Sequence, residues 1–241
     1  MIILITGTTS GIGKLLAEYY LNTNYNIVIG VNNKDSEFSN QNYINYIVDL
    51  TNYHDIHIFL QRLINNNKTP DIFYLNAGVN FRDYTNYLDI IIFKHVIDIN
   101  LYGVLNFISA ITYFKLINRK IISISSTSNI VPNPSNIGYY ISKLSLKLIF
   151  NLIEVKDKNN TYKTIILGPV KTKIMRNYET PSGLKKILLE FLSINTNIAI
   201  KKILKFTYND RKTLYYPFKS TFFYILVSFI IKLIPSLKKY L

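Results

Sequence analysis

The feature that most constrains this chain is a glycine-rich segment that directly follows its first apolar run. Residues 2–5 form the apolar run, and residues 6–13 read Thr-Gly-Thr-Thr-Ser-Gly-Ile-Gly. Gly7 permits a tight turn, Gly11 lets backbone N–H groups approach a phosphate, and Gly13 allows a helix to pack closely on the strand. A strand, a glycine turn and a helix N-terminus in this order predict a dinucleotide phosphate site; a plain turn capped by Thr or Ser is the alternative.

The rest of the chain alternates short apolar runs with segments of helical periodicity, which is typical of βαβ units and a parallel sheet. The predicted strands are residues 2–5, 27–31, 44–48, 72–75, 121–125, 164–167 and 213–216. We therefore expect residues 1–241 to form a single α/β domain, a doubly wound parallel sheet of about seven strands with helices on both faces.

The helices follow from spacing. Five apolar residues after the glycine turn fall on one helical stripe: Ile12, Leu15, Leu16, Tyr19 and Tyr20. Two longer periodic segments, residues 88–116 and 139–155, should cover one face of the sheet. Residues 32–41 are polar, so the helix expected after the second strand should be reduced to a loop or a single turn.

Composition narrows the class further. Apolar residues make up 49% of the chain, enough for a full core, and the absence of cysteine excludes disulfides and thiolate metal sites. The apolar run at the N-terminus is too short for a signal peptide, so we expect a cytoplasmic protein.

The positive charge is concentrated in the last third. Residues 1–170 carry 14 Lys and Arg against 11 Asp and Glu, whereas residues 171–241 carry 14 against 3. An acidic surface or an anionic substrate near the C-terminal region would explain this asymmetry, and a general bias towards Asn, Ile, Lys and Tyr would explain it equally. No nucleic-acid-binding motif accompanies the charge, so we expect no nucleic-acid partner.

Several further motifs follow the glycine segment in a fixed order. They are Asp49-Leu50, Asn76-Ala77-Gly78, Asn100, Ser126 thirteen residues before Tyr139, Tyr139 four residues before Lys143, and Gly168-Pro169-Val170-Lys171-Thr172. With these motifs, residues 2–172 resemble the short-chain dehydrogenase/reductase family in its compact form, a Rossmann-type fold. Leu75 stands where the family has the first Asn of its NNAG motif.

The resemblance implies an oxidoreductase that moves hydride between NADP(H) or NAD(H) and a carbonyl or secondary alcohol. It also implies a homodimer or homotetramer, built through the helices that contain Asn100 and Tyr139. The cofactor-binding residues would be Gly7, Thr9, Ser10, Gly11, Ile12, Gly13, Asn32, Lys34, Asp49, Leu50, Asn76, Ala77, Gly78, Tyr139, Lys143, Pro169, Val170 and Thr172. A catalytically silent NADP(H)-binding sensor or scaffold is the alternative function.

Hydride transfer to a carbonyl leaves an alkoxide, so a proton donor must lie within hydrogen-bond reach of that oxygen. Tyr139 is the candidate, and Lys143, four residues on and on the same helix face, should lower the phenol pKa from its usual value of about 10. The neighbouring Tyr140 is followed at that spacing by Leu144 and not by a cation.

Two other side chains complete the candidate catalytic set. Ser126 should polarise the substrate oxygen, although Ser125 and Ser128 lie close by and a loop-capping role is the alternative. By resemblance Asn100 would hold a water that links Lys143 to solvent; an Asn bonded to the backbone within a helix is the alternative.

The end of the second strand bears on the choice of cofactor. An acid there would bind the ribose hydroxyls, but the position holds Asn32, while Lys34 could reach a 2′-phosphate. The sequence therefore favours NADP(H) over NAD(H), against the alternative that Lys34 and Asp35 are solvated loop charges.

Three remaining features complete the predictions. Residues 173–205 should form a variable lid over a substrate with a hydrophobic portion. His54 and His57 share a helix face, but no third ligand follows at a suitable spacing, so we expect no metal. Residues 218–241 contain an apolar stretch with basic flanks that is too short to span a bilayer; it would cover the sheet, form a subunit contact or lie in the plane of a membrane surface.

Overall fold

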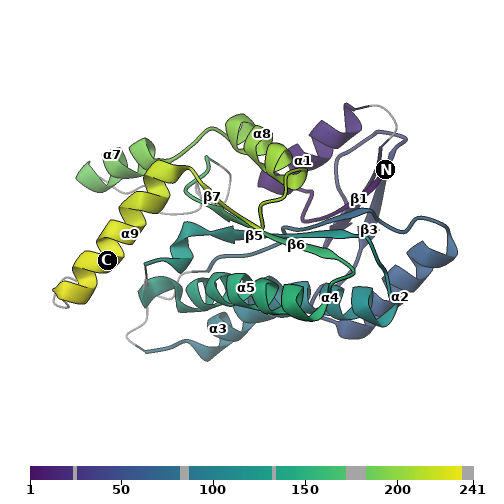
Figure 1. Ribbon diagram of the computed structural model, residues 1–241, viewed down its shortest axis with the longest axis horizontal. Coiled ribbons are helices and arrows are strands. Elements are labelled where there is room, and N and C mark those ends of the chain that lie inside the picture. Colours follow the sequence, from purple (N-terminus) through teal and green to yellow (C-terminus); the bar gives the residue numbers. More distant parts are fainter. Residues whose placement is uncertain (24–25, 82–86, 132–133, 172–182, 235–241) are drawn as a thin grey trace.

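The computed structural model describes residues 1–23, 26–81, 87–131, 134–171 and 183–234. Its centre is a seven-stranded sheet in the order β3-β2-β1-β4-β5-β6-β7, and every neighbouring pair is parallel (Figure 1). The strands are β1 (Ile2–Thr6), β2 (Ile27–Asn32), β3 (Tyr43–Ile47), β4 (Ile72–Leu75), β5 (Lys120–Ser126), β6 (Thr161–Leu167) and β7 (Thr213–Tyr216). The predicted doubly wound α/β sheet is confirmed, with each strand boundary within three residues of its predicted position.

Helices cover both faces of the sheet (Figure 1). The helices are α1 (Gly11–Leu21), α2 (Tyr53–Asn65), α3 (Ile90–Ile97), α4 (Gly103–Tyr113), α5 (Ile137–Lys156), α7 (Gly183–Leu192), α8 (Thr196–Thr207) and α9 (Phe218–Leu233). One apolar cluster joins α1 and α8 to the sheet, and a second joins α2, α4 and α5 to the opposite face. The central strands are buried on both faces, as expected of a parallel sheet.

The segment predicted as one helix over residues 88–116 is divided into three parts. Between α3 and α4 lies a π-helical turn, Asp98–Tyr102, with Asn100 at its centre. A π turn inserts an extra residue into the helical ladder and is frequent at functional sites. Residues 32–41 contain no helix, in agreement with the polar sequence there.

By length and composition alone, the helical stretch Ile90–Tyr113 could cross a membrane. Core helices of soluble domains pass the same test, and here Val104, Phe107 and Ile111 pack in the apolar cluster beneath the sheet. The α4 part therefore covers the sheet, whereas 28% of the apolar window of the whole stretch is buried.

The predicted lid over residues 173–205 differs from the structure at its C-terminal end. Residues from Thr196 onwards belong to α8, whose Ala199, Ile200 and Ile203 are buried in the core beside α1. Apolar periodicity alone could not separate a lid helix from a core helix, because both show one apolar face. Of the predicted lid, residues 173–182 lie outside the described residues, and α7 is its described helix outside the core.

Candidate functional site

The carboxyl ends of four neighbouring strands bring the predicted motifs to one edge of the sheet. The glycine segment follows β1, Asn76-Ala77-Gly78 follows β4, Ser126 ends β5, and Gly168-Pro169-Val170 follows β6. Strands β1 and β4 are neighbours although β2 and β3 separate them in sequence, so the strand order reverses there. Open parallel sheets bind ligands at such a switch point.

The glycine segment needs glycine for reasons visible in its backbone. Gly7 and Gly11 have φ angles of 75° and 61°, in the left-handed region that L side chains rarely adopt. A Cβ on Gly13 would lie 2.1 Å from the Gly7 carbonyl oxygen and 2.6 Å from Nδ2 of Asn76. The turn, the helix and the end of β4 can therefore approach closely only without side chains at these positions.

Helix α1 begins without the side-chain cap that α2, α3 and α8 have, and α4, α5 and α9 also lack one. Asn52, Asp89 and Asn195 accept hydrogen bonds from first-turn N–H groups of α2, α3 and α8, respectively. Ser10 precedes α1 and makes no such bond among the described residues, and the first turn contains no acidic residue. An uncapped positive helix end beside a glycine turn suits a phosphate.

Thr6 and Asn76 hold the ends of β1 and β4 together. The Thr6 hydroxyl accepts the N–H groups of Asn76 and Ala77 at 2.9 Å, and Nδ2 of Asn76 donates to the Thr6 carbonyl at 3.0 Å. Sequence reasoning did not single out Thr6, although it directly precedes Gly7 in the motif. These bonds hold the carboxyl ends of β1 and β4 at a fixed distance from each other.

Asn32 is buried in a polar network that holds the glycine turn. Its Oδ1 accepts the Thr8 N–H at 2.7 Å, and its Nδ2 donates to the Thr8 hydroxyl at 2.8 Å and to Oδ1 of Asn45 at 2.6 Å. The Tyr43 hydroxyl lies 2.7 Å from the Thr8 hydroxyl and closes the network. The Asn32 amide is thus occupied by protein partners, so its side chain positions the loop and is not free to contact a ribose directly.

Lys34 follows the same strand and is exposed, as is Asp35. None of the ion pairs within the described part of the chain includes Lys34, whereas Oδ1 of Asp35 accepts a hydrogen bond from Asn45 at 3.3 Å. Asp49 is exposed and is held by the Thr51 N–H and hydroxyl at 2.9 and 2.8 Å. The Leu50 carbonyl accepts Nδ2 of Asn106 at 2.9 Å, which ties this loop to α4.

Ser126, Tyr139 and Lys143 meet at the carboxyl end of β5. Ser126 is close enough to the Tyr139 phenol to lower its pKa, and Nζ of Lys143 lies 5.6 Å from the centroid of the Tyr139 ring. The Ser126 hydroxyl also donates to the Ser128 hydroxyl at 3.1 Å and accepts the Ser128 N–H at 3.2 Å, so it caps the turn after β5 as well. Lys143 is buried and donates to the Ile124 carbonyl at 2.9 Å. Ser125, by contrast, donates to the Lys143 carbonyl at 2.9 Å and fixes α5 on the strand, which separates its role from that of Ser126.

Asn100 lies beside this group on the π turn. Its Oδ1 accepts the Val79 N–H at 2.7 Å, its Nδ2 donates to the Val79 carbonyl at 2.8 Å, and Nδ2 also reaches the Ser142 hydroxyl at 3.3 Å. A Cβ on Gly78 would lie 3.1 Å from Oδ1 of Asn100 and 3.4 Å from Nζ of Lys143. Gly78 therefore adjoins both side chains, and Asn100 clamps the loop that follows β4.

The pKa of Tyr139 differs from the sequence prediction, which expected Lys143 to lower it. Burial raises the pKa of Tyr139 above its usual 10, although the nearby Ser126 side chain lowers it. Burial also lowers the pKa of Lys143 to about 8. In this structure the cost of charging a buried phenol outweighs the stabilisation of the phenolate, because the ammonium stands over the ring and makes its hydrogen bond to the backbone.

Residues 169–171, which follow β6, are held by backbone contacts with Ile194. Val170 pairs with Ile194, the Ile194 N–H donates to the Pro169 carbonyl at 3.0 Å, and the Lys171 N–H donates to the Ile194 carbonyl at 3.2 Å. Thr172, also predicted to bind cofactor, lies outside the described residues. Pro169 and Val170 thus stand at the base of the segment that leads towards α7.

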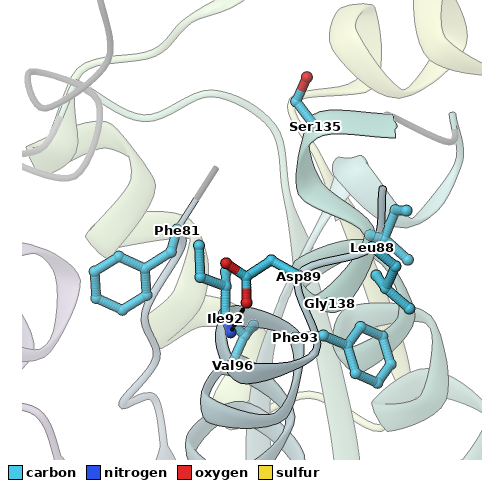
Figure 2. A pocket seen from close by; sticks show the side chains of 9 residues that line it. Phe81, Leu88, Asp89, Ile92, Phe93, Val96, Ser135 and Gly138 are labelled. Carbon is cyan, nitrogen blue, oxygen red and sulfur yellow. Dashed lines mark hydrogen bonds between the residues drawn. The ribbon is translucent and has the colours of Figure 1, made fainter. Parts of the chain in front are cut away.

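A small apolar hollow lies beside the start of α5, between α3 and the loop before it. Figure 2 shows Phe81, Leu88, Ile92 and Val96 around it, with Asp89 bonded back to the first turn of α3. Its cavity volume of about 10 Å³ holds no more than about one water. The hollow cannot accept a substrate as it stands.

His57 on α2 packs against aromatic rings, whereas His54 is exposed. The His57 ring lies 4.1 Å from the Tyr53 ring and 5.0 Å from the Tyr113 ring, measured between centroids, and burial lowers its pKa. Within the described ranges no three His, Cys, Asp or Glu side chains gather as a metal site would require.

The fold and the site together define a Rossmann-type nucleotide-binding protein: a switch-point glycine turn, an uncapped helix end, and a Ser, Tyr and Lys group at the same edge. The family model described as short chain dehydrogenase matches residues 1–182. The chain therefore belongs to the short-chain dehydrogenase family.

Curated relatives carry related names. The chain is 28% identical over 209 residues to an "11-beta-hydroxysteroid dehydrogenase-like 3" of Arabidopsis thaliana, covering 79% of this chain and 64% of that protein. It is 25% identical over 185 residues to "Glucose 1-dehydrogenase 2" of Bacillus subtilis, covering 70% and 72%. The matched region thus spans less than two thirds of the plant protein's length.

Solved structures share the fold. A short-chain dehydrogenase from Burkholderia cenocepacia in complex with NADP superposes with a TM-score of 0.77 at 18% identity, covering 98% of this chain and 94% of that one. A 4-hydroxyisoleucine dehydrogenase complexed with NADH gives 0.72 at 21%, covering 89% and 95%. Two structures with the same fold thus hold different nicotinamide cofactors.

Proposed function

We propose that this chain is an NADP(H)-dependent enzyme that reduces a carbonyl or oxidises a secondary alcohol, with Tyr139 as the general acid and base. The observation that carries the proposal is the placement of Ser126 and Tyr139 beside the buried Lys143, at the edge where the glycine turn leaves β1. A proton donor, an oxygen-polarising hydroxyl and a cation in one place are what this reaction requires.

The residues present fit a dinucleotide. The cradle at Gly7, Gly11 and Gly13 admits no Cβ without strain or collision, and the uncapped N-terminus of α1 would hold the pyrophosphate. The loops after β3, β4 and β6 would hold the remainder through Asp49, Leu50, Ala77, Gly78, Pro169 and Val170. The nicotinamide, when bound, supplies or accepts the hydride.

Four side chains would polarise the substrate oxygen, transfer its proton, supply positive charge and position the loop after β4. The Ser126 hydroxyl, which here donates to the Ser128 hydroxyl, turns to donate to the substrate oxygen, and the Tyr139 phenol delivers or removes the proton at that oxygen. Lys143 supplies positive charge beside the phenol, which works against the burial that raises the Tyr139 pKa in this structure. Asn100 holds the Val79 loop against this group, and the water relay to Lys143 is part of the proposal.

The preference for NADP(H) over NAD(H) is supported by two features of the loop after β2. Lys34 is exposed and outside the ion pairs of the described residues, so its ammonium can meet a 2′-phosphate. The residue at the strand end, Asn32, carries no charge, and its amide is used within the protein.

The test is a fluorescence titration with NADPH and NADH side by side, followed by a turnover panel of carbonyls for wild type and Tyr139→Phe. We expect tighter NADPH binding, and a loss of about 10² to 10⁴ in turnover for the variant with cofactor affinity retained. Binding without turnover on every carbonyl would favour a silent NADP(H) sensor, and absence of binding would reject both functions.

We also propose a homodimer or homotetramer formed through α4 and α5. Tyr102 and Tyr113 at the ends of α4, and Leu148, Leu152 and Val155 on α5, are exposed. Large apolar side chains of this kind on two adjacent helices favour a subunit contact, and light scattering of the purified protein checks it.

A further inference from the structure

Helix α9 exposes its apolar side and buries part of its polar side. The exposed side chains fall on one helical face: Phe218, Phe222, Ile225, Leu226, Phe229, Ile230 and Leu233. The buried residues of the helix include Ser220 and Thr221, whose hydroxyls donate to the Pro217 carbonyl. Helices at the surface of soluble domains show the reverse arrangement, so this face is built to meet something apolar.

Helix α7 extends the same surface. Ile187, Leu188 and Phe191 are exposed, and Phe191 adjoins the start of α9, because Nζ of Lys219 donates to the Phe191 carbonyl and lies 4.8 Å from its ring centroid. Figure 1 shows α7 and α9 at one end of the molecule, at the opposite end from α2. We call these ten exposed residues of α7 and α9 the α7–α9 face.

The charge around the face is positive. Lys219 and Lys232 are exposed near the two ends of α9, which contains no acidic residue, and Lys201, Lys202 and Lys205 are exposed on α8. Residues 171–241 as a whole carry 14 Lys and Arg against 3 Asp and Glu. Two such regions repel each other, which disfavours a second copy as the occupant, whereas an anionic surface is attracted.

The dimensions favour a helix that lies in a membrane surface. The 16 residues of α9 extend about 24 Å at 1.5 Å per residue, short of the roughly 30 Å hydrocarbon core. Exposed phenylalanines on one face and lysines at the ends are typical of helices that lie in the interfacial plane.

The face begins next to the candidate catalytic group. A Cβ on Gly168 would lie 2.1 Å from Oγ of Ser220, so the first turn of α9 packs directly on the end of β6. The same helix contacts the Thr127–Asn129 turn that follows Ser126. Whatever covers the α7–α9 face therefore lies beside the edge of the sheet that holds Ser126 and Tyr139, which we call the substrate edge.

We propose that the α7–α9 face docks this protein on anionic lipid membranes, with α9 in the plane of the surface, so that the substrate edge opens at the lipid interface and accepts a lipid-soluble carbonyl or alcohol. The docking proposal depends only on the α7–α9 face and the charge around it, whereas the choice of substrate rests on the proposed oxidoreductase function.

The test uses the full chain and sedimentation with vesicles of phosphatidylcholine, with or without phosphatidylserine. We expect binding to the anionic vesicles at low salt, weaker binding at high salt, and little binding to the neutral ones. The double variant Phe222→Ser with Phe229→Ser should lower the partition coefficient about a hundredfold, since two large apolar side chains no longer enter the lipid.

The matched control is Ile47→Ser with Ile58→Ser, because these residues are equally exposed but lie on β3 and α2. We expect wild-type binding from the control and unchanged thermal melting from both variants. The proposal is overturned if the wild-type protein does not bind anionic vesicles, or if the Phe double variant binds them as well as wild type. So does concentration-dependent self-association that the Phe variant abolishes without vesicle binding.

Turnover separates the two proposals. Anionic vesicles should raise the rate with a lipid-soluble ketone and leave the rate with a water-soluble one unchanged; equal effects on both overturn the substrate part. Vesicle binding without turnover of any carbonyl would instead reject the oxidoreductase function while docking stands.

Discussion

Two lysines among the residues that the structure describes are buried, and their surroundings differ. Lys143 on α5 and Lys163 on β6 are 5% and 2% exposed, and burial lowers the pKa of both. Nζ of Lys163 donates to the carbonyls of Phe206 and Asn209 at the C-terminal end of α8, where a helix carries partial negative charge. Nζ of Lys143 donates to the carbonyl of Ile124 and otherwise lies beside Tyr139, Gly78 and Asn100.

The difference shows that burial alone does not identify a functional cation. An ammonium has three donors, and a helix end that takes two of them uses the charge to hold the fold. An ammonium that gives one described bond to the protein keeps donors for a ligand. By this criterion Lys163 anchors α8, whereas Lys143 is suited to its proposed role beside Tyr139.

The largest expected effect is on turnover. Lys143→Met removes the charge that favours the Tyr139 phenolate, so turnover should fall about 10² to 10⁴-fold while the thermal midpoint stays the same or rises. Steady-state kinetics and thermal melts measure both. The control is Lys147→Met, one turn along α5, where Nζ lies over the Tyr215 ring and not at the site. If the two variants lose equal turnover, the assignment of Lys143 is wrong.

Lys163→Met should have the opposite profile. Two carbonyls at the end of α8 lose their donor, which should lower the free energy of unfolding by about 1–3 kcal/mol. Turnover per folded molecule should not change, because the side chain lies away from the substrate edge. Urea titration together with kinetics gives both quantities, and a variant of wild-type stability would show that this lysine is not an anchor.

The smallest expected effect is the dependence of the free energy of unfolding on pH, which tests the lowered pKa of Lys143. The folded pKa of Lys143 is about 8 and its ordinary pKa is 10.5, so between these values the unfolded chain holds a proton that the folded chain has released. The unfolding free energy of wild type should therefore rise relative to Lys143→Met as pH goes from 8 to 10, by at most about 1.4 kcal/mol per pH unit.

Tyr139 contributes near pH 10, because the unfolded phenol ionises there while the folded one stays protonated, but this contribution is common to both proteins and cancels in the comparison. Urea titrations of the two proteins at pH 7, 8, 9 and 10 supply the difference. Parallel pH curves would mean that Lys143 keeps an ordinary pKa despite its burial.

Local sequence determined the strands, the glycine turn and the order of the site motifs. Each depends on neighbours within a few residues: apolar runs on strand periodicity, Gly7 and Gly11 on a positive φ, and Tyr139 and Lys143 on one helical turn. The parallel sheet then carries these motifs to one edge, because every strand ends on the same side.

The tertiary structure decided what depends on contacts between distant residues. Asn32 and Lys34 look equally placed for a cofactor in sequence, yet Asn32 is taken up by Thr8 and Asn45, partners from other elements. The same holds for α8, which packs in the core where a lid was predicted, and for α9, whose apolar side faces outwards. Periodicity specifies that a helix has an apolar face, but only packing against the rest of the chain determines which way that face points and how much a buried charge costs.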